Sequence, residues 1–215
     1  MILNFSQPEL DPDQEAHLPS VLWQREGGLD ASTRESLNQA LRAAQISAGS
    51  KLWLPGEELH DEMVLLSGAA RMFLVDARGR EWNTHLLVAP CFFPPLHLRT
   101  RGGRARQRAI AQSECRIQRI DSTVFCKLRE DVASLLRLGA RLVDEEMERL
   151  RSREEALLGM DLPGRVDLLL RDRPEIWQAF RRKDIASYLH ATPEALSRAL
   201  PVGLGRSAPN APPSA

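Results

Sequence analysis

The strongest constraint on this chain is a change near residue 121 from short apolar segments to one long helical pattern. Between residues 50 and 121, short apolar segments alternate with turn signals such as Pro55-Gly56, Ser67-Gly68 and the 76–80 loop. Segments of this kind at regular spacing predict the β-strands of a small antiparallel barrel or sandwich. The candidate strands are KLWL (51–54), EMVLL (62–66), RMFLV (71–75), EWNTHLLV (81–88) and CRIQRI (115–120).

Beyond the strands, apolar residues recur every three or four positions, which is the spacing of one helix face. They are Val132, Leu135, Leu136, Leu142, Val143, Met147 and Leu150. A helix that continues to Leu158 is about 40 Å long at a rise of roughly 1.5 Å per residue. A small barrel is too short to cover this stripe unaided, so part of it is expected to pack on another surface. The alternative is a long helix packed on its own barrel.

Length and composition allow one medium domain and one small domain, because 215 residues with 43% apolar content can bury a sizeable core. The formal net charge is zero, so any affinity for nucleic acid has to come from a local patch. The acidic, Pro-broken N-terminus does not resemble a signal peptide, and no apolar run has the length of a membrane span. We therefore expect a cytoplasmic protein with no membrane partner. Separately, we expect an amphipathic helix over 33–45, before the strands.

Residue patterns that would indicate an enzyme are missing from the sequence. His60, His85 and His97 fall in the strand region without an H-x-H or H-x-D pair, so no metal site is predicted. No nucleophile elbow, P-loop or dinucleotide fingerprint occurs. We therefore predict a protein that is not an enzyme, with no catalytic residues and no cofactor, although the sequence does not decide against a haem ligated by His or Cys.

The dispersed Cys91, Cys115 and Cys126 indicate reduced, mostly buried thiols.

The segment 181–200, RRKDIASYLHATPEALSRAL, predicts two short helices joined by a tight turn. Thr192 can cap the second helix, Pro193 suits its first position, and Pro201 should end it. Leu196, Ala199 and Leu200 fall on one side of that helix. Glu194, Ser197 and Arg198 fall on the other side, where they can reach a ligand. This is helix-turn-helix geometry, for which an ordinary helical hairpin is the alternative.

The same segment resembles the helix-turn-helix of the Crp/Fnr family of bacterial transcription regulators. The matching positions are Lys183, Asp184, Ile185, Ala186, Leu189, Thr192, Glu194, Ala195, Leu196, Ser197, Arg198 and Leu200. The resemblance implies that Glu194, Ser197 and Arg198 read base edges, because Arg can donate to guanine and Glu can accept from cytosine. We add Thr192, Arg182 and Lys183 to the predicted DNA-binding set. His190 stands where the family usually has Gly, which requires a tight and even left-handed backbone conformation.

The resemblance extends over residues 50–200 and implies an α+β fold with an antiparallel jelly-roll sensor barrel. Gly68, the 76–80 hairpin, Ala111, Cys115 and Ile117 match that sensor domain. The implied organisation is a cyclic-nucleotide-binding-like sensor domain over 1–125, a dimerisation helix over 126–159, a small winged-helix-like domain over 160–200 and a disordered tail over 201–215. The implied partners are DNA, a second copy of the chain, a small-molecule effector and RNA polymerase.

The cyclic AMP signature of the family is missing. Cys91-Phe92-Phe93-Pro94-Pro95 stands in place of the F-G-E run, so the usual ribose clamp is not expected. The Arg-rich stretch 99–108 replaces the phosphate segment, and Arg104 and Arg106 lie nearest to the phosphate-binding Arg of the family. They are the candidate effector-binding residues. The alternative is a solvated strand edge that alternating Arg keeps from pairing.

The C-terminal residues are the largest departure from the family pattern. PVGLGRSAPNAPPSA after Leu200 cannot build a packed core, whereas family members continue with a longer helix and a β-hairpin wing. The function that the sequence favours is a ligand-responsive, sequence-specific DNA-binding regulator that acts as a homodimer. The alternative is a dimeric small-molecule sensor or adaptor that has lost DNA binding through a truncated C-terminal domain.

Overall fold

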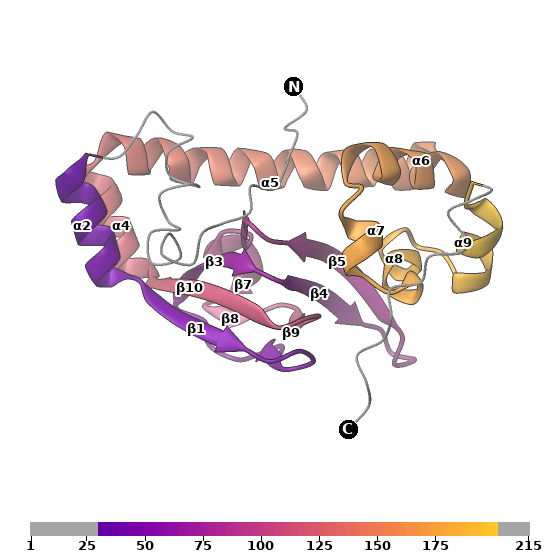
Figure 1. The fold of residues 1–215 in the computed structure, drawn as a ribbon, viewed down its shortest axis with the longest axis horizontal. Coiled ribbons are helices and arrows are strands. Elements are labelled where there is room, and N and C mark those ends of the chain that lie inside the picture. The colour runs from indigo at the N-terminus through magenta and orange to yellow at the C-terminus, as the bar shows by residue number, and fades with distance from the viewer. Residues whose placement is uncertain (1–29, 202–215) are drawn as a thin grey trace.

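The computed structural model describes residues 30–201, so 1–29 of the predicted sensor domain and 202–215 of the predicted tail lie outside the described residues. The helices are α2 (Ala31–Ala40), α3 (Leu96–Arg99), α4 (Ser122–Asp131), α5 (Ala133–Gly159), α6 (Leu162–Asp172), α7 (Ile176–Ala179), α8 (Arg182–Tyr188) and α9 (Pro193–Ala199). The strands are β1 (Arg42–Ile46), β2 (Lys51–Trp53), β3 (Asp61–Ser67), β4 (Ala69–Val75), β5 (Glu81–Val88), β6 (Cys91–Phe92), β7 (Thr100–Arg101), β8 (Arg104–Ala105), β9 (Arg108–Ala111) and β10 (Cys115–Asp121). The strands gather in one half of the molecule and α6 to α9 in the other, and α5 runs along both halves (Figure 1).

The strands form two four-stranded antiparallel sheets, ordered β1-β10-β3-β6 and β2-β9-β4-β5, together with the short pair β7-β8. Side chains from both sheets meet in one core, in which Trp53 packs edge-on against Phe93 with ring centroids 5.6 Å apart. The predicted α+β class with antiparallel strands is confirmed. Two sheets that share a core take the place of a closed barrel, which does not occur among the described strands.

Gly68 makes the turn that carries the chain from β3 in one sheet to β4 in the other. Its φ is +87°, and a Cβ built on it would lie 2.1 Å from the carbonyl oxygen of Glu114. Gly79, in the β4–β5 hairpin, also has a positive φ of +78°, but nothing lies within 4 Å of its Cβ position. Of these two turns, only the one at residue 68 therefore requires Gly for the close approach of two backbones.

The helix that we predicted over 126–159 is divided at Val132, whose extended backbone (φ −126°, ψ 104°) separates α4 from α5. Leu135 and Leu138 of α5 are buried in a core that includes Phe125 of α4. Gly139 makes room for the guanidinium of Arg129 on α4, because a Cβ there would lie 2.5 Å from its Cζ. The start of α5 therefore packs on the strand-rich part of the chain, which we call the sensor because the sequence analysis predicts a sensor domain there. No helix in the described part of the chain is both long and apolar enough to cross a membrane.

The helix that we predicted over 33–45 is wrong in its second half. The chain is helical only to Ala40, and residues 42–46 form β1, which pairs with β10 from Arg42 opposite Arg119 to Ile46 opposite Cys115. Asp30 caps the helix, because its carboxylate accepts from the Thr33 N–H. Pairing with a distant strand overrode the local helical pattern.

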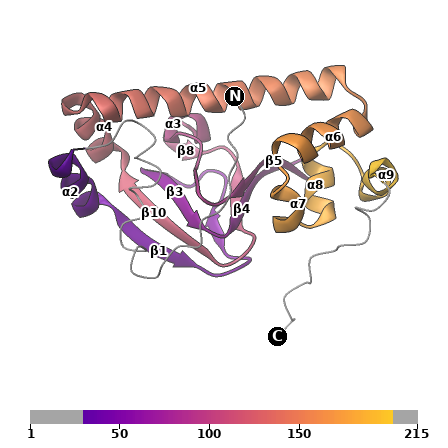
Figure 2. The same cartoon turned by 45° about the horizontal axis from the view of Figure 1, so that its top comes forward.

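The C-terminal helices form one cluster beneath the end of α5 and beside β5 (Figure 2). Its core contains Val166, Leu169, Ile176, Trp177, Phe180, Ile185, Ala186, Leu189 and Leu196. Ala69 of β4 and Leu86 of β5 belong to the same core. The helical cluster therefore buries its apolar face partly against the sensor sheet. All three cysteines are free, with Cys115 buried and Cys91 half-buried, so the expectation of mostly buried thiols fails at Cys126, which is exposed.

We expect Gly68→Ala to lower the free energy of unfolding by about 2 to 5 kcal/mol, because backbone strain at a positive φ adds to a clash with the Glu114 carbonyl. The matched control, Gly79→Ala, should cost only the strain, about 1 to 2 kcal/mol. Urea unfolding followed by tryptophan fluorescence measures both. Equal losses in the two variants would contradict the close approach at Gly68.

Candidate nucleic-acid interface

The two predicted short helices are present as α8 and α9, and α9 begins at the predicted cap. The Thr192 hydroxyl accepts a hydrogen bond from the Ala195 N–H at 3.2 Å, and Pro193 is the first residue of α9. His190 has a φ of +53°, so the left-handed conformation expected in the turn is confirmed. The Ala191 N–H donates to Ala186 O at 2.9 Å and the His190 N–H to Ser187 O at 3.2 Å, which together close a Schellman cap.

The proposed base-reading side chains lie together on the outer face of α9. Glu194, Ser197 and Arg198 are exposed, whereas Leu196 on the inner face is fully buried. The pKa of the Glu194 carboxyl is lowered, first by its own backbone N–H, then by the Thr192 hydroxyl and the charge of Arg198. An ionised carboxylate and a guanidinium therefore share this face, an arrangement that can accept from cytosine N4 and donate to guanine.

The remaining predicted DNA-binding residues flank this face. Thr192 uses its hydroxyl as the α9 cap. Lys183 is exposed near the start of α8. Arg182 is half-buried, with its guanidinium carbon 5.2 Å from the ring centroid of Trp177. The structure thus brings the starts of the two helices together, but the packing of Arg182 on Trp177 was not expected from the sequence.

The free edge of β5 is the surface on which the helix-turn-helix is docked. Strand β5 is the last strand of its sheet, so one row of its backbone groups has no strand partner. The Ser187 hydroxyl of α8 donates to Glu81 O at 2.7 Å and accepts from the Asn83 N–H at 2.9 Å. Farther along the strand, Arg173 donates to Leu86 O at 3.4 Å. Side chains of the C-terminal helices therefore take the place of a neighbouring strand.

The long helix α5 covers the same edge from above. Arg149 donates to Thr84 O at 3.1 Å, and Arg153 donates to Asn83 O at 3.1 Å and to Tyr188 O at 3.2 Å. Thr84 is the extra residue of a β-bulge, because Met72 pairs with His85 and Phe73 with Asn83. One arginine of α5 therefore joins the sensor edge to α8.

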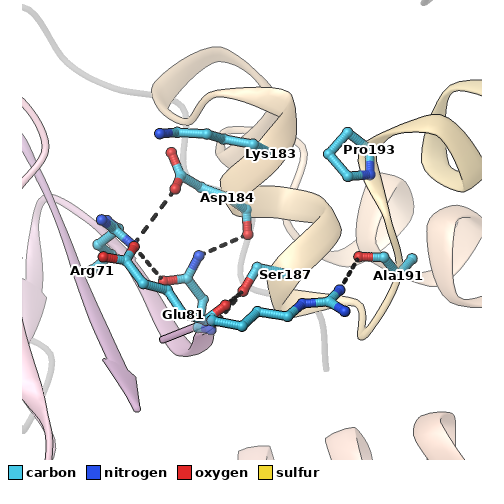
Figure 3. Close-up of a pocket in the computed structure, with 9 residues that line it drawn as sticks. Arg71, Glu81, Lys183, Asp184, Ser187, Ala191 and Pro193 are labelled. Carbon is cyan, nitrogen blue, oxygen red and sulfur yellow. Dashed lines mark hydrogen bonds and ion pairs between the residues drawn. The ribbon is translucent and has the colours of Figure 1, made fainter. Parts of the chain in front are cut away.

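Asn83 is the polar centre of this junction and is fully buried. Its Nδ2 donates to Asp184 O at 2.9 Å, and its Oδ1 accepts from Arg71 at 3.2 Å. Arg71 also lies 2.7 Å from Glu81 and 3.6 Å from the Asp184 carboxylate (Figure 3). Burial raises the pKa of Asp184, and the charge of Arg71 opposes that shift. The sensor sheet and α8 thus share one buried polar network.

A second buried polar group joins β5 to α5. Nε2 of His85 lies 2.9 Å from a Glu146 oxygen and 2.6 Å from Nη2 of Arg149. Burial lowers the pKa of His85 to about 4, and the charges of Arg149 and Arg153 act in the same direction against the opposing effect of Glu146. His60 and His97 are exposed elsewhere. No group of three or more potential metal-ligating His, Cys, Asp or Glu side chains occurs among residues 30–201.

The two arginines predicted to bind an effector lie on the sensor surface. Arg104 pairs with Glu58 at 2.8 Å and donates to Gly56 O at 2.9 Å, and Arg106 is exposed. The buried arginine is instead Arg99, which the sequence reasoning did not single out from its Arg-rich neighbours. Nothing in the local sequence pattern distinguished it.

Arg99 projects into the sensor core, where its charge is held by carbonyl oxygens. Its Nε donates to Pro94 O and its Nη2 to Asp61 O, both at 2.6 Å. Its guanidinium carbon lies 5.1 Å from the ring centroid of Trp53, and Glu62 lies 3.7 Å away. Burial lowers the pKa of Arg99 to about 10. The residue beside the predicted effector segment is therefore engaged by the protein itself.

No protein-family model matches this sequence, and no curated protein matches it. Solved structures match its fold. FixK2 from Bradyrhizobium japonicum has a TM-score of 0.66 at 17% identity, over 74% of this chain and 82% of that chain. A protein from Eubacterium rectale assigned to the Crp/Fnr family of transcriptional regulators has a TM-score of 0.61 at 17% identity, over 83% of both chains. The c-di-GMP-responsive global regulator CLP from Xanthomonas campestris has a TM-score of 0.61 at 15% identity, over 79% of this chain and 89% of that chain. The fold expected from the sequence is therefore confirmed.

We expect Asn83→Ala to lower the free energy of unfolding by roughly 2 to 3 kcal/mol, because the buried Asp184 carbonyl loses its donor and Arg71 loses an acceptor. The control, Asn38→Ala, changes an exposed residue of α2 and should stay within about 0.5 kcal/mol of the parent. Urea unfolding gives the two values. Hydrogen exchange at residues 184–187 should speed up only in the first variant, and unchanged exchange there would argue against the docking role.

Proposed function

We propose, starting from the fold that this chain shares with Crp/Fnr regulators, that it is a ligand-responsive, sequence-specific DNA-binding transcription regulator that acts as a homodimer. The observation that carries this proposal is the face of α9. There, Glu194, Ser197 and Arg198 stand exposed together, while Leu196 anchors the helix from behind. A recognition helix needs this division between an anchored side and a polar side that can enter the major groove.

The dimer is proposed from the outer side of α5. Leu135 and Leu138 face the core of their own chain and Leu142 packs partly against it, whereas a second set of apolar residues on α5 is exposed. Leu136 is 53% exposed, Met147 38% and Leu150 40%. The positions 136, 143, 150 and 157, with 140 and 147 between them, follow the alternating spacing of a coiled-coil seam. Two such helices side by side would present two copies of α9 to half-sites about one turn of DNA apart.

Signal transfer is proposed to run through α5 and β5. An effector that moved α5 against the sensor would act on Arg149 and Arg153, which hold the β5 edge, and Arg153 also holds α8. A displacement of either part therefore reaches the helix-turn-helix through direct contacts.

Arg104 and Arg106 stay the candidates for an acidic effector. The usual cyclic AMP pose is not part of the proposal, nor is a resident cofactor or catalysis. At a promoter, such a regulator would act on RNA polymerase.

A dimeric sensor or adaptor without DNA binding is the second candidate. The observation that favours it is the length of α9, which ends at Ala199 after seven residues. A helix of about two turns offers few positions for base and phosphate contacts. The two candidates share the sensor and the dimer seam, so only a measurement of DNA binding separates them.

We expect the full chain to enrich a common sequence from a random pool of duplex DNA. Arg198→Ala should then weaken binding to that sequence by about 1 to 3 kcal/mol and relax the base preference at one position of each half-site. The control, Arg137→Ala, removes an equal charge from an exposed position of α5 and should leave the preference unchanged. If no sequence is enriched while the dimer is intact, DNA reading fails and the sensor or adaptor function stands.

We expect Leu150→Glu to convert the dimer into a monomer, because it places a charge in the middle of the apolar seam. Ser152→Glu adds the same charge outside the seam on the same helix and should leave the dimer intact. Light scattering reports the mass, which should fall from twice the 24.1 kDa of one chain to that value only for the first variant. A dimer that survives Leu150→Glu would rule out this seam.

A further inference from the structure

The tip of the β4–β5 hairpin is held in a fixed shape by Asp76. Its carboxylate accepts from the backbone N–H groups of Arg78 and Arg80, each at 2.9 Å, and from Nε1 of Trp82 at 3.0 Å. The pKa of Asp76 is lowered, chiefly by the bond from Trp82. The tip therefore presents the side chain of Arg80 in a defined position.

That position is beside the turn of the helix-turn-helix. Nη2 of Arg80 donates to Ala191 O at 3.3 Å, and its guanidinium carbon lies 4.0 Å from the ring centroid of Trp82. The Trp82 ring in turn lies 4.9 Å from that of His190. An exposed cation from the sensor thus contacts the backbone two residues before the first residue of α9, Pro193.

A polar cavity of about 180 Å³ lies between the hairpin and the two helices. Arg80, Lys183 and Pro193 line it, and all three are exposed. The two carboxylates of the cavity, Glu81 and Asp184, lie against Arg71, on the side away from Ala191 (Figure 3). Arg71 offsets one of these two negative charges, and with Arg80 and Lys183 included the lining carries a net charge of +1. Arg80 and Lys183 are the exposed cations next to the helix starts.

We propose that Arg80 contacts a phosphate of the DNA backbone beside the start of α9, so that the sensor domain supplies part of the DNA-binding surface. In helix-turn-helix complexes the first helix crosses the backbone while the start of the second reaches the bases, which brings a phosphate to the region between the two helix starts. Arginine suits this position because a guanidinium with one donor engaged keeps others for a phosphate oxygen. The inference rests on the proposed function, since it needs duplex DNA against α9.

The salt dependence of DNA binding tests this contact without a known operator. Each neutralised phosphate adds about 0.9 to the slope of log Kobs against log salt concentration. With a short random-sequence duplex as the probe, Arg80→Gln should lower the magnitude of the slope by about 1 and weaken binding about eightfold at roughly 0.1 M salt. Arg80→Lys keeps the charge and should keep the parent slope.

Arg78→Gln is the matched control, because it removes the same charge from an exposed residue of the same hairpin. Arg78 bonds Asp76 through its backbone N–H, which the substitution keeps. We expect it to leave the slope at the parent value. If the parent chain binds the duplex and Arg80→Gln weakens binding without a change in slope, Arg80 has only a structural role and the inference is overturned. An unchanged affinity overturns it as well. If the parent chain does not bind the duplex at all, the proposed function fails together with this contact.

Discussion

The free edge of β5 is the constraint on which the arrangement of the molecule depends. An edge strand exposes backbone groups that invite pairing with another chain unless something covers them. Here side chains from α5 and the C-terminal helical region bond to five backbone groups of this edge. They are the carbonyls of residues 81, 83, 84 and 86 and the N–H of Asn83. The same contacts therefore cover this edge and orient the helix-turn-helix. The outward direction of the polar face of α9 follows from how α8 sits on β5.

The parts of the site that the sequence predicted are those set by local backbone chemistry. A Thr before a Pro starts α9, and the residue at the family's Gly position, His190, takes the positive φ that such a turn needs. Capping and turn geometry depend on neighbours a few residues away, so they can be recognised in one sequence. The division of α9 into a buried side and an exposed side follows from the same periodicity.

The parts that sequence reasoning missed depend on residues far apart in the chain. Residues 42–46 carry a helical pattern, yet they pair with β10, 69 to 77 positions away. Arg99 is one of several arginines in its segment, and only the packed sensor shows that it is the buried one. The junction at Asn83 involves residues about one hundred positions apart, and its sequence reads as an ordinary strand. No local pattern encodes such contacts.

The shared core of the C-terminal helices and the sensor sheet has a consequence for how such a chain can change over time. Ala69 and Leu86 are sensor residues, yet they complete the apolar core that supports Leu196 and hence α9. A helical module taken from another protein of this fold would meet a sheet surface shaped for different side chains. Recombination that exchanges whole domains is therefore disfavoured. The strands and the C-terminal helices of this chain are therefore expected to have changed by matched substitutions across β5.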